Sequence, residues 1–143
     1  MTRSQRQRIL ALTPRERLKS RWTALGIDRP HRRVRGPETG MAMVRGRMGA
    51  TGNAFNLGEM TMTRASVTLE DGPLGHGWVR GRDFHHAELI ALIDACAQQD
   101  DLRERIDAEL IAPLADELAT RNAEASRTAA ATRVDFFTMV RGE

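Results

Sequence analysis

The sequence predicts an α+β protein, in which a small, mainly antiparallel sheet packs with a helical layer and an N-terminal amphipathic helical arm precedes both. Two patterns predict this class. Apolar and polar residues alternate between about residues 41 and 80, as in strands, and apolar residues recur every three to four positions after Arg82, as in helices. We expect a basic arm and linker at residues 1–36 and an α+β unit at 37–143. A chain of 143 residues is long enough for only one domain, so we expect the arm and the α+β unit to form one domain overall.

The arm is predicted to contain two helices, the first near residues 3–12. Thr13-Pro14-Arg15-Glu16 signals the second, because Thr13 can cap it, proline suits the first helical position and Glu16 can complete a capping box. Gly26 suits its left-handed end. The second helix carries an apolar stripe at helical spacing, which packs either on the rest of this chain or on another chain. The residues of this stripe are interface candidates: Leu18, Trp22 and Leu25.

Charge is distributed unevenly along the chain. Residues 1–36 hold ten arginines and Lys19 against two acids, a net +9, whereas the remainder holds 11 arginines against 17 acids, a net −6. The basic arm could face an acidic partner surface, a polyanion or the protein's own acidic helices. Alternatively, it is simply a solvated basic helix. Nucleic acid is the least favoured partner, because no helix-turn-helix, zinc-finger or aromatic RNA-binding signature accompanies the charge.

The next segment is predicted to change from linker to sheet. Residues 28–40, DRPHRRVRGPETG, indicate a hinge-like linker with a short strand around Val34. The sheet then covers about residues 32–80, with turns at 49–53 and 70–73 and a strand at 74–80. Gly58 interrupts the alternation and is predicted to mark a bulge.

A helical layer is predicted over residues 83–131. Asp83 caps its first helix, a second begins at Asp100 or Asp101, and Pro113 starts or kinks a third. The closing segment, residues 133–141, is β-branched and aromatic and is predicted to add a strand buried on both faces. Its apolar residues are further interface candidates: Val134, Phe136, Phe137 and Met139.

No apolar run approaches the roughly 20 residues that cross a bilayer, and the N-terminus lacks the apolar centre of a secretory signal. Cys96 is the only cysteine, so no internal disulfide can form. We therefore expect a cytoplasmic protein.

Possible metal ligands are densest around the first helix of the layer: His76, Asp83, His85, His86, Glu88 and Cys96. Adjacent His85 and His86 point about 100° apart on a helix and cannot chelate along one face. We expect no metal here. No serine, cysteine or lysine stands in a nucleophile motif, so we predict no catalytic residue.

A glycine-rich stretch at residues 46–53 invites comparison with phosphate-binding loops, but it lacks the Gly-Lys-Ser/Thr of a P-loop, and a tight hairpin explains its glycines equally well. Arginines on neighbouring strands predict a basic sheet face that binds either an anion or an acidic partner, the partner being favoured. The anion- or partner-binding candidates are Arg45, Arg47, Arg64, Arg80, Arg82, His85, His86 and Glu88.

Several blocks resemble the PhnG family, the G subunit of the bacterial carbon–phosphorus lyase core complex. The similarity runs in order from about Gly40 to the end, and its blocks are RGRMGATGNAFNLGEMTMTRASVTL (45–69), LGHGWVRGRDFHHAELIALIDA (74–95), LIAPL (110–114) and TRVDFFTMVRGE (132–143). The basic N-terminal region resembles the family only loosely.

The resemblance implies an accessory, structural role in a hetero-oligomer with H, I and J subunits that degrades organic phosphonates. The supported step transfers ribose triphosphate from a purine nucleotide, ATP, to an alkylphosphonate. The resemblance places that displacement on the I subunit, and the iron–sulfur cluster on the J subunit, so no cofactor is expected in this chain. The alternatives are a stand-alone phosphate- or phosphonate-binding enzyme using the arginine-lined face, and a nucleic-acid-binding regulator using the basic arm.

Overall fold

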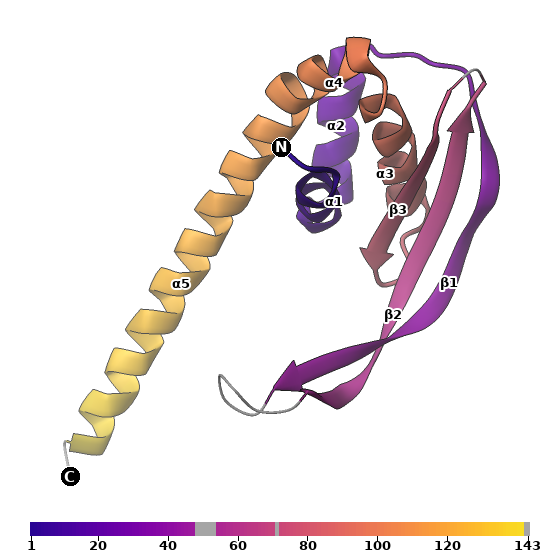
Figure 1. The fold of residues 1–143 in the computed structure, drawn as a ribbon. Helices are drawn as coiled ribbons and strands as arrows, with labels where there is room; N and C mark the ends of the chain where they lie inside the picture. Colours follow the sequence, from indigo (N-terminus) through magenta and orange to yellow (C-terminus); the bar gives the residue numbers. More distant parts are fainter. Residues whose placement is uncertain (48–53, 71, 142–143) are drawn as a thin grey trace.

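The computed structural model describes residues 1–47, 54–70 and 72–141, with side chains at 1–45, 57–70 and 72–131. The predicted α+β class is confirmed: a three-stranded antiparallel sheet, in the order β1-β2-β3, carries helices on one face (Figure 1). A long C-terminal helix extends away from this body (Figure 1).

The arm folds as two helices, α1 (Arg3–Leu12) and α2 (Arg15–Leu25), as predicted. Gly26 ends α2 in the left-handed region at φ 66°, also as predicted. The prediction that Thr13 caps α2 is wrong. The Thr13 hydroxyl donates to the Ile9 carbonyl of α1 at 2.7 Å, so it is not available to cap α2. Pro14 takes the cap position instead, without a side-chain bond.

The first strand, β1 (His31–Arg47), begins within the segment predicted to be a hinge-like linker, and that prediction is wrong for residues 31–40. Pairing with β2 supplies backbone partners to residues whose composition is typical of loops. Register shifts near Arg35 and Glu38 accommodate Gly36, which lies at φ 66°, and Pro37, which has no N–H to donate.

The other strands are β2 (Ala54–Leu69) and β3 (Leu74–Arg80), and β3 has the bounds that the sequence predicts. β1 and β2 form a hairpin that reaches beyond β3, since β3 pairs only with residues from Met62 to Thr68 of β2. The predicted turn at 49–53 lies outside the described residues. The bulge predicted at Gly58 is confirmed by a register shift there, where Leu57 is the extra residue.

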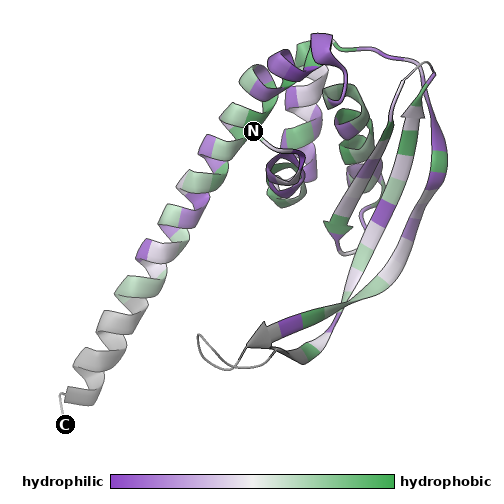
Figure 2. Ribbon diagram, viewed as in Figure 1, coloured by the Kyte–Doolittle hydropathy of each residue, from purple (hydrophilic) through white to green (hydrophobic). Residues whose placement is uncertain are grey.

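The core lies between the sheet and α3 (Phe84–Ala97), a helix buried on nearly every side. Figure 2 shows much of α3 as hydrophobic. Glycines let the layers approach closely: a Cβ on Gly75 would lie 2.1 Å from the Ala91 carbonyl, and one on Gly77 would lie 2.3 Å from that of Ala87. Each fully buried aliphatic side chain, such as Ile90, contributes about 1.5–3 kcal/mol.

The chain continues through α4 (Asp100–Ile106), a π-helical turn η1 (Asp107–Ile111) and α5 (Ala112–Arg141). The predicted starts at Asp83, as cap of α3, and at Asp100 are confirmed. Pro113 stands in the first turn of α5, directly after the π-helical turn. The proline ring and its missing N–H disturb the helical hydrogen bonds of the preceding turn, which explains the widening there. None of the described helices is long and apolar enough to cross a membrane.

The prediction of a C-terminal strand at residues 133–141 is wrong. The backbone there continues α5 as a helix to Arg141. A helix satisfies its backbone groups within the segment, whereas a strand needs a neighbour, and extending a helix beyond the alanine-rich run costs little once that run is helical. The side chains of the four interface candidates in this segment lie outside the described residues.

Candidate functional site

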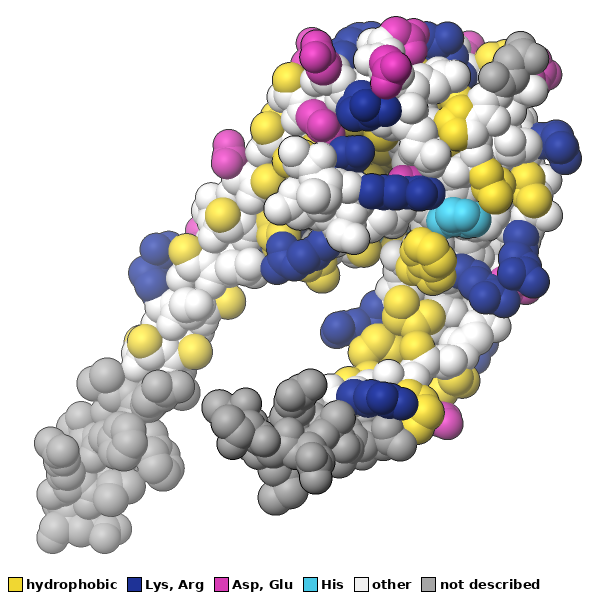
Figure 3. Space-filling model, in the orientation of Figure 1, with side chains coloured by type: hydrophobic (Ala, Val, Ile, Leu, Met, Phe, Trp, Pro, Cys, Tyr) yellow, Lys and Arg dark blue, Asp and Glu magenta, His cyan; other side chains and the backbone are white. Residues whose placement is uncertain are grey.

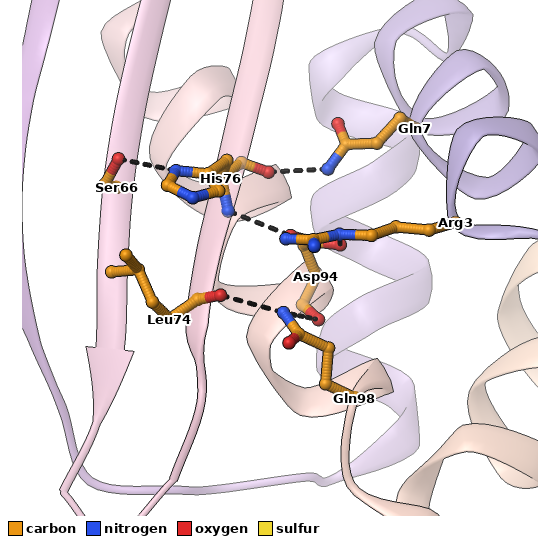
Figure 4. A network of polar contacts seen from close by, with 7 residues as sticks. All are labelled: Arg3, Gln7, Ser66, Leu74, His76, Asp94 and Gln98. Atoms are coloured by element: carbon orange, nitrogen blue, oxygen red, sulfur yellow. Dashed lines mark hydrogen bonds and ion pairs between the residues drawn. The ribbon is translucent and has the colours of Figure 1, made fainter.

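A polar network fastens the free edge of β3 to the helices (Figure 4). The buried Asp94 carboxylate accepts the His76 backbone N–H at 2.9 Å and two donors of Arg3 at 3.0 and 2.6 Å. Side-chain amides complete the edge, as Gln7 donates to the His76 carbonyl at 2.6 Å and Gln98 to that of Leu74 at 2.8 Å. These bonds occupy edge groups that a neighbouring strand would otherwise use.

Ion pairs show where the charge of the arm is directed. Arg17 and Arg21 both contact Glu117 of α5, at 2.5 and 3.0 Å, and Arg3 contacts Asp94 of α3. Further pairs join Arg6 to Asp107, Arg15 to Asp83, Arg29 to Asp101 and Arg33 to Glu88. The sequence left open what the basic arm faces. In the structure, most of the basic residues at 1–36 face acids of this same chain.

The apolar stripe of α2 is likewise used internally. Leu18 and Trp22 are buried in the core of this chain, and Leu25 packs against that core. The sequence left the choice between the parent domain and another chain open, and the structure places all three interface candidates on the parent domain.

The arginine candidates do not form one basic face. Arg64 and Arg80 lie on the sheet face away from the helices, and the Glu38 carboxylate accepts from Arg64 at 2.6 Å. By alternation along β1, Arg45 projects from the opposite face. Arg82 follows β3 in a turn, and the side chain of Arg47 lies outside the described residues. The prediction of a single basic sheet face is therefore wrong, because the register of each strand with β2 places Arg45 of β1 and Arg80 of β3 on opposite faces.

The two adjacent histidines have separate environments. His86 is buried, and its Nε2 lies 3.0 Å from the Leu10 carbonyl, so it joins α3 to α1. His85 is exposed and borders a hollow of about 480 Å³ between α2, β1 and α3, together with Glu88. The other lining residues are Arg15, Glu16, Lys19, His31, Arg33, Leu89 and Leu92.

Three cationic side chains, Arg15, Lys19 and Arg33, line this hollow. Arg15 and Arg33 are held at its rim by Asp83 at 3.1 Å and Glu88 at 2.8 Å. Lys19 makes no ion pair with any described residue. Leucines form an apolar floor, so the arrangement suits a small anion or an acidic side chain with an apolar part.

Within the described residues, no group of three or more His, Cys, Asp or Glu side chains could hold a metal. Burial raises the pKa of the Cys96 thiol to about 11, which keeps it protonated and unreactive at neutral pH. Neither observation assigns chemistry to this chain.

Apolar side chains are exposed along the hairpin where it leaves the helices (Figure 3). Met41 and Leu57 are each 62% exposed, Met43 is 56% exposed and Trp78 nearby is 46% exposed. A shallow depression of about 400 Å³ joins Trp78 to Met62 and Ala42. Met41 and Met43 lie on the sheet face opposite to Trp78, so apolar side chains are exposed on both faces of this region. Exposed apolar surface is typical of sites that bind other proteins.

Sequence reasoning missed several of these residues. Asp94 is the one acid in the apolar run LIALIDACA (89–97), and this placement is the signal that could have indicated a buried partner. His31 and Arg33 were assigned to a linker, so nothing indicated that β1 would bring them beside α3.

The fold and the exposed hairpin define a small α+β protein equipped to bind other proteins. The family model for "Phosphonate metabolism protein PhnG" matches residues 1–142. A relative from Rhizobium meliloti (strain 1021), described as alpha-D-ribose 1-methylphosphonate 5-triphosphate synthase subunit PhnG, is 46% identical over 144 residues, covering 99% of this chain and 90% of the relative. The chain belongs to the PhnG family.

Proposed function

We propose that this chain is an accessory, non-catalytic subunit of an alpha-D-ribose 1-methylphosphonate 5-triphosphate synthase in organic phosphonate degradation. Family membership over nearly the whole chain carries the proposal, since the relative from Rhizobium meliloti is named as a subunit of that synthase. The exposed apolar hairpin supports it independently, because a subunit must bury surface against its partners.

The partners in this proposal are the H, I and J subunits of a carbon–phosphorus lyase core complex. Chemistry belongs to those partners: ATP supplies the ribose triphosphate at another subunit, and an iron–sulfur cluster serves bond cleavage in a third. This chain contributes binding surface and has no cofactor of its own.

Two features weigh against the alternatives. An enzyme acting through an arginine-lined face would need convergent arginines, whereas Arg45 and Arg80 lie on opposite faces of the sheet and Arg64 is paired with Glu38. A nucleic-acid regulator would need most cations of the arm to be free, whereas Arg3, Arg17 and several others are engaged by acids of this chain.

The test is co-expression of this chain with H-, I- and J-type subunits, followed by an assay of purine release from ATP with methylphosphonate. We expect the chain to co-purify with them, the complete set to release base, and the isolated chain to release none. Robust base release by the pure chain would make it an enzyme in its own right. Full activity of the set without this chain would exclude the subunit role.

A further inference from the structure

Over residues 39–44, the outer edge of β1 has backbone groups without a backbone partner among the described residues. Backbone groups of successive residues in an antiparallel strand point to opposite sides. The Thr61 carbonyl accepts from the Gly81 N–H at 2.8 Å and so points toward β3. Its neighbours on β2, Met60 and Met62, therefore point toward β1, where their partners are Ala42 and Gly40.

It follows that the alternate residues of β1, Thr39, Met41 and Met43, direct their N–H and C=O groups away from the sheet. β1 is the terminal strand in the order β1-β2-β3, so none of the described strands pairs with that side. The register from Thr39 to Val44 is regular, so no bulge interrupts the edge there.

Other edges of the sheet are protected. The edge of β3 is occupied by Asp94, Gln7 and Gln98. The first half of β1 carries register shifts and Pro37, which are devices that discourage pairing with another chain. Residues 39–44 have neither device, and two of their side chains are exposed methionines.

We infer that residues 39–44 of β1 are a strand-addition site: an extended, acidic segment of another subunit pairs with this edge, and its apolar side chains cover Met41 and Met43. This inference rests on the proposed function, since it assigns the surface through which the chain joins the synthase. Backbone hydrogen bonds supply the affinity in this mode, and alternate side chains supply the specificity.

Charge selects the occupant. Residues 39–44 carry no charge, whereas the rest of β1 has five arginines and one glutamate, so the strand as a whole favours an acidic partner over a second copy. The glutamate, Glu38, is already held by Arg64 and Arg35. Arg32 and Arg45 make no ion pair with any described residue. An acidic strand satisfies these charges, whereas a second copy repels them.

Proline at position 43 tests the pairing directly. Met43→Pro removes an N–H that points away from β2, and edge strands tolerate such a proline, so the chain should stay folded. Val34→Pro is the matched control, because Val34 is an exposed residue of the same strand at a register shift outside residues 39–44. We expect Met43→Pro to retain its melting profile yet lose at least about tenfold in co-purification with co-expressed H-, I- and J-type subunits, while Val34→Pro binds as wild type.

Hydrogen exchange provides the second readout. In the free chain the amides of Met41 and Met43 should exchange fast and that of Ala42 slowly, since only Ala42 faces β2. In the complex the two methionine amides should slow by about tenfold or more.

The outcomes separate the two proposals. Failure of the wild-type chain to join the subunits would overturn the proposed function and this inference with it. A wild-type complex in which Met43→Pro binds normally and the methionine amides stay fast would overturn the inference alone. A homodimer that Met43→Pro disrupts, without a heteromeric complex, would assign the edge to a second copy.

Discussion

At the scale of single residues, Asp94 has the most demanding position. Its carboxylate is buried, yet it receives three hydrogen bonds, from the His76 N–H and from two donors of Arg3. The bond to Asp94 raises the pKa of Arg3, so the guanidinium stays charged. A buried carboxylate is tolerated only with partners of this kind. Asp94 therefore joins α1, α3 and the edge of β3 at one point.

We expect Asp94→Asn to lower the free energy of unfolding by about 2–3 kcal/mol, because the charge-assisted bonds to Arg3 are lost while one bond to the strand can persist. Asp101→Asn is the control: Asp101 is 64% exposed and its pair with Arg29 should contribute less than about 1 kcal/mol. Urea unfolding measures both. Equal effects of the two substitutions would show that the network does not fasten the edge.

At the scale of elements, the contact between α3 and β3 depends on the absence of side chains. Gly75 and Gly77 face the helix, and backbone atoms of α3 occupy the space where their Cβ atoms would stand. Alanines on the facing side of α3, Ala87 and Ala91, keep that surface flat. This close approach brings Asp94 within reach of the backbone of His76.

Gly75→Ala should therefore be severely destabilising. Its Cβ would lie 2.1 Å from the Ala91 carbonyl and 2.4 Å from the Ala95 N–H, and neither backbone atom can move alone. We expect a loss of about 3 kcal/mol or more. Gly40→Ala is the control, since its Cβ would meet nothing within 4 Å. Thermal melts decide the point, and a normal melting temperature for Gly75→Ala would mean that the layers are not in close contact.

At the scale of the whole molecule, ion pairs bind the N-terminal arm to helices from the far end of the chain. Arg17 and Arg21 share Glu117, which lies about 100 residues away in sequence. Hydrogen bonding from Arg17, with a smaller contribution from Arg21, lowers the pKa of Glu117 from 4.5 to about 2. The arm is thus an integral part of the body rather than an appendage.

This pKa shift predicts a pH dependence of stability. A carboxyl whose folded pKa lies below its unfolded value stabilises the protein fully above about pH 4.5 and loses that contribution as the pH falls toward 2. Glu117→Gln should lower stability by about 1–2 kcal/mol at pH 7, and the difference from wild type should shrink below pH 4.5. Glu109→Gln, which removes an exposed helical pair with Arg105, is the control. A difference for Glu117→Gln that does not change with pH would contradict the assigned role of the carboxylate.

Features that local physics controls could be predicted from the amino-acid sequence. The period of apolar residues determined the α+β class, and the bounds of β3, the cap at Asp83, the end at Gly26 and the bulge at Gly58 each follow from a residue type suited to one backbone geometry. The family also followed from ordered blocks of residues.

Which surfaces meet depends on contacts between residues far apart in the sequence, and these could not be predicted. The linker became the first half of β1 because β2 pairs with it, and the arm's charge was matched by Asp94 and Glu117, which are far away in sequence. The arginine candidates separated because strand parity and register, rather than composition, set the face of each side chain. Residues 133–141 became helical because a strand exists only beside another strand, whereas a helix satisfies its own backbone.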